Sequence, residues 1–388
     1  MALRSQIRLQ REGLFYAMIV AAVLAGAIAR QLNLLMLVGS LLAAPFLFAL
    51  LYGWVALRRI RVERRLPARL RADERLVVDI SATNRGKLQN AWGVEVADEV
   101  SRDAAPGEQS RTAVKVFFPM ISARESRQAA YQGKLPRRGR YQFGPIRVST
   151  RFPMGLFHHS IVLHQQESLL VHPKFGRLTR DWAQMARENP LGGQRMQRRG
   201  LLETDFYGIR DWRTGDSRRR IHWRTSARRG SLVVREFEQR RSQDLALLVD
   251  LWQPCDPSSE QLENVETAIS YVATLIADAC RHPGRQVTLV LAGQEELFRS
   301  GRAEPMFLRE QMDALALVAP HHDDSLPPLL GQSLAMIGAS TASLAISTRE
   351  IDLAALRAAA AERDAQLEGR VLRAINVSNA ELSQYFTP

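Results

Sequence analysis

Two long apolar runs at the start of the chain restrict its fold more than any other feature. They cover residues 14–29 and 34–57, and the short polar loop 30–33 separates them. A helix needs about 20 predominantly apolar residues to cross a bilayer. The sequence therefore predicts a hairpin of two transmembrane helices within residues 1–60. A cleaved signal peptide is the alternative for the first run, because Ala27-Ile28-Ala29 resembles a cleavage site.

Arginines are concentrated where this hairpin joins the rest of the chain. Arg4, Arg8 and Arg11 precede the first run, Arg30 alone lies in the loop, and seven arginines fall within Arg58–Arg71. Basic residues favour the cytoplasmic side of a membrane. We therefore expect a multi-pass protein of the bacterial inner membrane, with both termini and the soluble body in the cytoplasm. The Arg58–Arg71 cluster is also suited to contact anionic lipid.

The charge of the chain is polarised along its length. The formal net charge is +13, from 53 basic and 40 acidic residues. Residues 1–241 hold 43 of the basic and 20 of the acidic side chains, whereas residues 242–388 hold 10 and 20. A basic segment such as Arg195–Arg241 can bind nucleic acid or another polyanion. The acidic C-terminal part and the absence of aromatic-glycine RNA motifs argue against this use, so no nucleic acid is expected as a partner.

Residues 72–172 alternate between apolar and polar side chains over short stretches. Leu76–Ile80 leads to a turn at Asn84-Arg85-Gly86, and Ala113–Phe117 stops before Pro119. Several short strands at this spacing predict a small β-sandwich-like domain. Residues 173–200 are polar, contain Gly192-Gly193 and lack alternation, so we interpret them as a linker.

The pattern changes from Asp244 onward. A short apolar run at residues 245–251 is typical of a buried parallel strand, and apolar residues at helical spacing follow it over residues 262–276. Further strands and helices are predicted to alternate along the rest of the chain: strand 287–291, helix 305–318, strand 343–347, helix 351–361 and strand 371–377. This alternation predicts an α/β sheet with helices on both faces.

One segment, residues 205–238, combines two tryptophans with a dense set of arginines. Asp216 is predicted to cap the amino end of a helix, Gly230 to end it, and residues 231–237 to form a strand. The helix would expose a line of arginines four residues apart, which we name the arginine stripe: Arg220, Arg224 and Arg228. Three other residues would turn inward beside it: Ile221, Trp223 and Ala227.

This segment resembles the signature of the domain-of-unknown-function family 58 (DUF58). The matching positions occur in order: Arg210, Trp212, Gly215, Asp216, Arg220, Ile221, Trp223, Ala227, Arg228 and the strand Val234-Arg235-Glu236-Phe237-Glu238. With the strand–helix alternation, the resemblance implies that residues 201–388 hold the signature and an α/β domain similar to the Rossmann-like von Willebrand factor A (vWA) fold. It also implies a MoxR-type AAA+ ATPase as partner. Together with Arg224, the signature residues are the candidate protein-binding site.

The vWA fold often binds Mg²⁺ through an Asp-x-Ser-x-Ser motif after its first strand. Here Asp250 ends that strand, but Trp252 and Pro254 stand in place of the serines and offer no side-chain oxygen. We therefore expect a degenerate metal site, with no metal and no other cofactor. Asp250 is expected to cap a helix or to pair with an arginine of the signature.

The densest cluster of histidines and carboxylates is His321-His322-Asp323-Asp324, which lacks the spacing of a known metal motif. We interpret it as a solvated loop. Phosphate-binding loops, nucleophile turns and kinase signatures are absent from the sequence. No catalytic residue is therefore predicted, and we expect a protein that is not an enzyme. Cys255 and Cys280 are expected to be buried, reduced thiols.

The arginine stripe has two possible uses. It can dock an acidic partner, with Trp212 and Trp223 as anchors. It can also pair inside the protein with nearby carboxylates: Asp211, Asp216, Glu236 and Glu238. We expect a membrane-anchored cytoplasmic scaffold that works with a MoxR-type AAA+ ATPase in the assembly or activation of a client complex. The alternative is a membrane-tethered polyanion or nucleic-acid binder that uses Arg195–Arg241.

Overall fold

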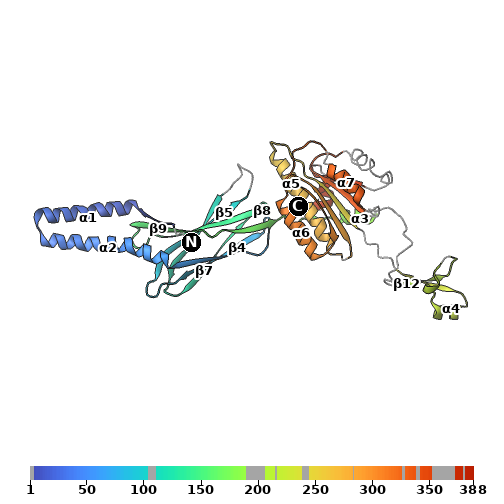
Figure 1. The fold of residues 1–388 in the computed structure, drawn as a ribbon, viewed down its shortest axis with the longest axis horizontal. Helices are drawn as coiled ribbons and strands as arrows, with labels where there is room; N and C mark the ends of the chain where they lie inside the picture. Colours follow the sequence, from blue (N-terminus) through green and yellow to red (C-terminus); the bar gives the residue numbers. More distant parts are fainter. Residues whose placement is uncertain are drawn as a thin grey trace. The chain divides into compact units, whose positions relative to one another are not determined.

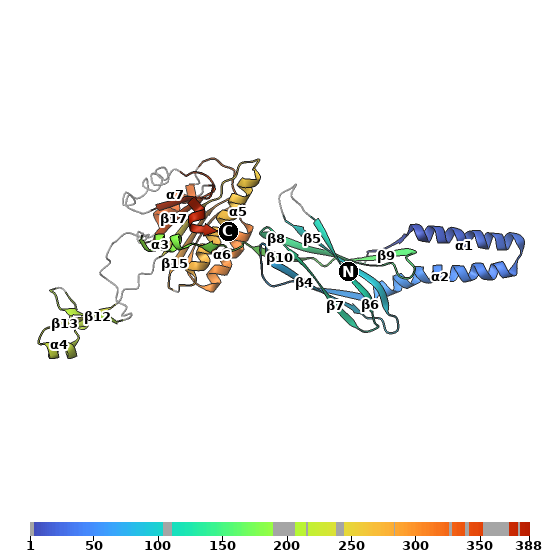
Figure 2. The same ribbon diagram turned by 180° about the vertical axis from the view of Figure 1, so that it is seen from behind.

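The computed structural model describes residues 4–103, 111–188, 206–214, 216–237, 244–282, 284–325, 328–337, 341–351, 372–378 and 381–388. The chain divides into two compact units, the first extending to Lys174 and the second holding most of Phe175–Pro388 (Figures 1 and 2). Gly192-Gly193, Gly215 and the helix predicted over residues 351–361, apart from Ile351 itself, lie outside the described residues.

The first unit begins with a hairpin of two helices, α1 (Arg11–Arg30) and α2 (Asn33–Arg58), which lie along each other (Figure 1). Both helices are long and apolar enough to cross a membrane. Only 17% of the most apolar window of α1 and 11% of that of α2 is buried. A core helix of a soluble protein is mostly buried, so the apolar surface of this hairpin faces outward from the fold.

Two β-sheets pack face to face next to the hairpin. The larger has the order β1-β9-β8-β10-β3, with β5 bound to β8 and β6 to β5, and the smaller has the order β2-β4-β7. Their strands are β1 (Arg4–Leu9), β2 (Ile60–Arg65), β3 (Leu70–Arg71), β4 (Arg75–Asn84), β5 (Ala91–Arg102), β6 (Arg111–Ile121), β7 (Ser126–Lys134), β8 (Gly139–Thr150), β9 (Phe157–Leu163) and β10 (Glu167–His172). Period-two alternation points Val78 and Ile80 of β4 and Val96 of β5 into one shared core.

The sandwich starts earlier in the chain than the predicted 72–172 domain. β1 precedes the helical hairpin, and β2 contains part of the Arg58–Arg71 cluster that the sequence analysis assigned to lipid. Arg64 is buried in the core, where its Nη1 atom lies 2.6 Å from Asp98 Oδ1. The Tyr131 hydroxyl donates to Asp98 Oδ2 over 2.8 Å. Arg64 is thus a core residue and not a lipid contact, because period-two alternation turns it inward.

The second unit contains a five-stranded mixed sheet in the order β16-β15-β14-β17-β18. Its strands are β14 (Leu245–Asp250), β15 (Gln286–Ala292), β16 (Glu296–Arg302), β17 (Ala342–Ser347) and β18 (Leu372–Asn376). All neighbours are parallel except β15 and β16. β16 was not predicted from the sequence, because it is an edge strand whose side chains are largely exposed. An apolar run marks a strand buried on both faces but not an edge of this kind.

Helices cover both faces of this sheet. Figures 1 and 2 show α5 (Ser259–Ala279) and α6 (Pro305–Leu317) on one side and α7 (Pro328–Met336) on the other. Leu330 of α7 packs with Ala246 and Leu248 of β14. Leu247 points to the opposite face and is fully buried as well. An apolar residue at every position of β14 therefore reflects a strand that is covered on both sides.

Residues 175–188 are not a linker. β11 (Arg177–Leu178) pairs with β19 (Phe386–Thr387), which follows the short helix α9 (Glu381–Tyr385). α3 (Arg180–Glu188) buries Trp182, whose ring meets that of Tyr271 edge-on at 5.9 Å between centroids. This part of the predicted linker belongs to the second unit. A two-residue strand that pairs with the far end of the chain leaves no periodic signal in the sequence.

The signature segment forms a small substructure of its own, which we name the signature module. β12 (Phe206–Asp211) and β13 (Val233–Phe237) form an antiparallel hairpin. Their connection contains the 3₁₀ turn η1 (Arg218–Arg220) and the helix α4 (Trp223–Arg229) (Figure 1). The predicted strand is confirmed, whereas the predicted helix is shorter and begins later than expected.

Candidate functional site

An ion pair between two signature residues fixes the turn that follows β12. Arg210 donates from Nη1 to Asp216 Oδ2 over 2.7 Å and from Nη2 to Asp216 Oδ1 over 2.8 Å. The Arg213 backbone N–H donates to Asp216 Oδ2 over 2.9 Å. These hydrogen bonds, those from Arg210 foremost, lower the pKa of Asp216 to about 2. Asp216 therefore closes a turn and does not cap a helix.

His222, which the sequence analysis did not select, caps α4. The Nδ1 atom of His222 accepts from the Thr225 backbone N–H over 3.2 Å. The backbone N–H of His222 donates to the Val233 carbonyl over 2.8 Å. Ser226 is buried and accepts the Val233 N–H over 2.9 Å. Gly230 ends the helix with a φ of 71°, so that prediction is confirmed. Histidine is an uncommon N-cap, so this cap cannot be recognised from the residue type alone.

The exposed face of the module differs from the predicted one. Ile221 is buried as expected, but Trp223 is 66% exposed and Ala227 is exposed too. Arg220 lies in η1, so Arg224 and Arg228 are the two members of the arginine stripe that lie in α4. Within the described residues, none of these three arginines forms an ion pair, in contrast to Arg210. The helix starts at Trp223, and this register turns the tryptophan outward.

The remaining signature residues contribute in different ways. Trp212 is half-buried, and its backbone N–H donates to the Leu232 carbonyl over 2.8 Å. Arg235 lies on β13 opposite Ile209 and is exposed. Gly215 and the side chain of Glu236 lie outside the described residues. The module thus pairs the half-buried side chains of Arg210 and Asp216 and presents Trp223 with several arginines on its surface.

A second cluster lies at the carboxyl end of the parallel strands of the second unit. β15 lies on one side of β14 and β17 on the other, so the strand order reverses at β14. Open α/β sheets bind ligands at such a reversal, beyond the carboxyl ends of the strands. Asp250 ends β14 and Ser347 ends β17, and the two residues are partners in the register. We name Asp250, His321, Ser347 and Arg349 the carboxyl-edge cluster.

Asp250 is fully buried, and both of its carboxylate oxygens are occupied. His321 Nε2 lies 2.7 Å from Oδ1, and Arg349 donates from Nε to Oδ2 over 2.9 Å. The Ser347 hydroxyl donates to Oδ2 over 3.0 Å. A buried carboxylate requires such partners, because burial of an unpaired charge costs on the order of several kcal/mol. Asp250 neither caps a helix nor pairs with a signature arginine, contrary to both expectations.

The segment 321–325 is tied to the sheet and is not a freely solvated loop. The backbone of His321 forms an isolated parallel β-bridge with that of Trp252, and His322 Nδ1 lies 2.8 Å from the Gln253 carbonyl oxygen. Trp252 Nε1 donates to Asp324 Oδ1 over 3.0 Å, and Arg349 Nη1 donates to the Asp324 carbonyl over 2.7 Å. The side chains of His322 and Asp324 remain exposed. The two adjacent histidines point different ways, and His321 points into the carboxyl-edge cluster.

The carboxyl-edge cluster does not fit the Mg²⁺ site of the vWA fold. A metal would have to displace Arg349 and His321 from the two Asp250 oxygens, and the guanidinium of Arg349 beside it would repel a cation. Trp252 and Pro254 supply no side-chain oxygen. Among the described residues, no group of three or more His, Cys, Asp and Glu side chains could hold a metal ion. The cationic partner of Asp250 is the guanidinium of Arg349.

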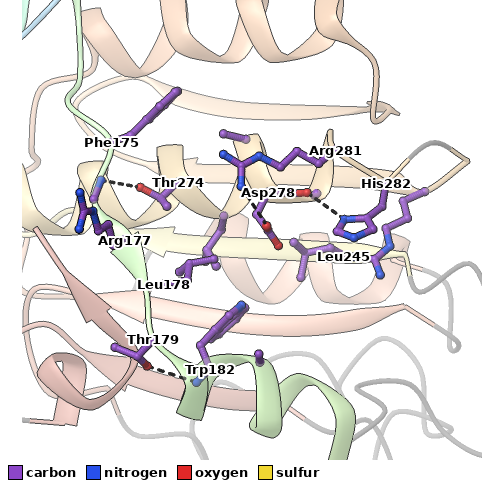
Figure 3. A pocket seen from close by; sticks show the side chains of 16 residues that line it. Phe175, Arg177, Leu178, Thr179, Trp182, Leu245, Thr274, Asp278, Arg281 and His282 are labelled. Carbon is purple, nitrogen blue, oxygen red and sulfur yellow. Dashed lines mark hydrogen bonds and ion pairs between the residues drawn. The ribbon is translucent and has the colours of Figure 1, made fainter.

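A cavity of about 640 Å³ lies at the other end of β14 (Figure 3). Leu245, the first residue of β14, lines it together with Leu178 and Trp182. Arg281 and His282 lie at its α5 end, where His282 Nδ1 is 3.1 Å from the Asp278 carbonyl oxygen. None of the candidate site residues that the sequence predicts lines this cavity.

Cys255 is exposed and Cys280 half-buried, so the expectation of two buried thiols is wrong for Cys255.

Comparison with known protein families matches part of the second unit to a family model. A family model described as "Protein of unknown function DUF58" matches residues 208–325. The matched range includes Arg210, Asp216, Asp250 and His321. An uncharacterised Bacillus subtilis protein, YeaD, is 26% identical over 262 residues, which make up 65% of this chain and 61% of that protein. This chain therefore spans about three fifths of the length of that curated relative.

Comparison with solved structures gives only distant similarities. A CARDB domain from Pyrococcus furiosus is 11% identical and covers 29% of this chain and 86% of its own, with a TM-score of 0.19. The sporulation control protein Spo0M from Bacillus subtilis is 12% identical and covers 31% of this chain and 58% of its own, with a TM-score of 0.20. At these scores neither similarity establishes a shared fold.

Proposed function

We propose that this chain is a membrane-anchored adaptor that binds an acidic protein partner through its signature module and performs no catalytic turnover. The observation that supports this most directly is the 66% exposure of Trp223 on a helix that also exposes Arg224 and Arg228. A large aromatic side chain beside arginines is typical of the residues that dominate protein interfaces. Carboxylates of a partner would complement the arginines and steer the encounter.

The anchoring part of the proposal rests on the helical hairpin. α1 and α2 start and end at the same sandwich, because β1 leads into α1 and β2 follows α2. Two antiparallel apolar helices rooted in one domain would cross a bilayer and return to the same side. The arginines beside these roots favour the cytoplasmic side. The soluble body would then lie in the cytoplasm.

The partner class follows from the resemblance to the DUF58 family, which implies a MoxR-type AAA+ ATPase. The second unit would have the vWA-like fold that this resemblance also implies, with Asp250 at the end of its first strand. Its neutralised carboxylate favours binding that does not need a divalent cation. The adaptor would bring the ATPase to the membrane for the assembly or activation of a client complex.

The test is affinity purification of the detergent-solubilised full chain from its native membranes. We expect an AAA+ ATPase to be recovered, in the presence of EDTA as well. Trp223→Ala should reduce its recovery roughly 10-fold or more, as loss of an interface anchor does. Arg224→Glu with Arg228→Glu should do the same. Arg299→Glu, on the exposed edge strand β16, is the matched charge-reversal control.

Two results would contradict the proposal. One is the absence of an AAA+ ATPase from wild-type eluates, and the other is full retention of the ATPase by Trp223→Ala. The alternative function, binding of a polyanion through the basic segment, predicts tight binding of an oligonucleotide that weakens steeply with salt. The exposed arginines on η1 and α4 are the observation that favours this alternative.

A further inference from the structure

We propose that the end of the β-sandwich next to the helical hairpin inserts an apolar collar into the interfacial layer of the bilayer. The collar consists of six exposed apolar residues on four segments: Ile7, Leu9, Leu88, Trp92, Phe152 and Met154. Its partner is the phospholipid surface around the hairpin, so this inference rests on the proposed membrane anchoring. It adds a second, peripheral contact that fixes how the sandwich sits on the membrane.

The collar lies where the two helices leave the sandwich. The Gln10 N–H, just before α1, donates to the Leu156 carbonyl over 3.0 Å. The rings of Tyr52, in α2, and Phe152 lie 5.2 Å apart, and those of Phe152 and Trp92 lie 5.9 Å apart. The Tyr52 hydroxyl donates to the Asn90 carbonyl over 2.7 Å, which holds the loop that contains Leu88 against the same helix. Loops from three parts of the sandwich thus converge on one level of the hairpin.

The first strand adds to the same face. Ile7 pairs with His159 in the register of β1 and β9, and Leu9 pairs with Phe157. Directly opposed residues of antiparallel strands project on the same side of a sheet. His159 Nε2 lies 3.2 Å from the Ala49 carbonyl oxygen of α2, so this side faces the hairpin. Ile7 and Leu9 are nevertheless 44% and 45% exposed.

Helix length places this level at the membrane surface. α1 extends 20 residues beyond Gln10. At 1.5 Å per residue this is about 30 Å, the thickness of the hydrocarbon core. α2 reaches Tyr52 after a similar length of about 20 residues. If the apolar part of the hairpin fills the hydrocarbon core, the collar lies in the interfacial layer, where tryptophan and other aromatic side chains are enriched.

Backbone and charge at the collar are consistent with a lipid contact. Met154 has a φ of 60°, a left-handed conformation that favours glycine, and yet holds a large apolar side chain that is 61% exposed. Strained residues of this kind are concentrated at functional positions. Exposed basic residues border the collar: Arg58, Arg59, Lys87 and Arg151. They can bind lipid phosphates. Arg65 lies six residues beyond Arg59 along β2, which is about 20 Å and exceeds a Debye length of about 8 Å.

The test uses spin labels on the full chain in vesicles of phosphatidylcholine and phosphatidylglycerol. Cys255→Ser and Cys280→Ser remove the native thiols, and single cysteines are then introduced in separate variants. Met154→Cys and Leu88→Cys report on the collar, and Ile19→Cys reports on the middle of α1. Gly133→Cys is the control, because Gly133 is exposed at the far end of β7 and an added Cβ meets nothing within 4 Å.

Accessibility to oxygen relative to a water-soluble nickel complex measures depth in the bilayer. We expect the ratio to be highest at Ile19→Cys, lowest at Gly133→Cys, and several-fold above the control at both collar positions. Collar ratios equal to that of Gly133→Cys, with Ile19→Cys in the hydrocarbon, would overturn the collar and leave the anchoring intact. A water-accessible Ile19→Cys would overturn the membrane anchoring itself and the collar with it.

Discussion

Asp250 and Arg349 form a buried ion pair at 2.9 Å although they are 99 residues apart in the sequence. The side chain of Asp250 is fully buried and that of Arg349 is 16% exposed. The pair joins the carboxyl end of β14 to the residue that lies two positions after β17. The guanidinium also donates to the carbonyl of Asp324, so one side chain connects two strands and a loop.

Removal of Arg349 should loosen this edge of the sheet. Arg349→Leu leaves a buried carboxylate with only His321 and Ser347 as partners, and loss of one member of a buried pair typically costs about 3–5 kcal/mol. Addition of Asp250→Asn should recover part of the loss, because it removes the unpaired charge. Hydrogen exchange of peptides from β14 and β17 measures the effect locally. Arg299→Leu is the control, and unchanged exchange in Arg349→Leu would contradict the assignment.

Asp216 should titrate at unusually low pH because of Arg210. Its pKa of about 2 lies below the ordinary value of 3.8. A lowered pKa in the folded state means that the contact is fully present above about pH 4 and is lost as the pH falls toward 2. Arg210→Ala should move the midpoint toward 3.8, as followed by NMR of ¹³C-labelled aspartate. Arg220→Ala should leave it near 2, and an equal shift in both variants would argue against a specific role of Arg210.

Gly53 should be required where α2 meets the sandwich. An added Cβ would lie 2.2 Å from the His159 ring, far below a normal contact. Gly53→Ala should therefore destabilise the first unit by about 1–3 kcal/mol, as overpacking of a core does. Gly26→Ala is the matched control, because its Cβ would meet only Leu35 at 3.8 Å. Thermal unfolding in detergent, followed by circular dichroism, compares the two. A melting temperature of Gly53→Ala equal to that of Gly26→Ala would show that the contact is dispensable.

Acid should weaken the same contact through His159. Burial lowers the pKa of His159, an effect that its hydrogen bond to Ala49 opposes. The unfolded chain therefore takes up the proton first as the pH falls below about 6.5, the ordinary value for histidine, and stability is lost there. His158 is affected in the same direction, with burial first and Arg151 second. His159→Asn should reduce the fall in melting temperature between pH 7.5 and pH 5.5, and an unaltered fall would assign the effect elsewhere.

The sequence alone predicted the elements that a long apolar run or a regular alternation of apolar and polar residues marks. The two long apolar runs correspond to α1 and α2, and the segments with period-two alternation correspond to strands of the sandwich. The apolar run that contains Asp250 corresponds to β14. Gly230 ended its helix as expected, because a left-handed residue after a helix is most easily a glycine. These features depend on local periodicity or on one residue's backbone preference, so neighbouring residues suffice to reveal them.

Only the tertiary structure decided which distant residues meet. The order of parallel strands brought Asp250 to Arg349 and His321, and no local pattern encodes that order. Strand register buried Arg64 beside Asp98, although the sequence places it in a run of arginines suited to lipid. A shift of a few residues in the start of α4 turned Trp223 outward, because a helical residue's direction changes by about 100° with each position. Charge and hydrophobicity are properties of the sequence, whereas their partners are set by packing.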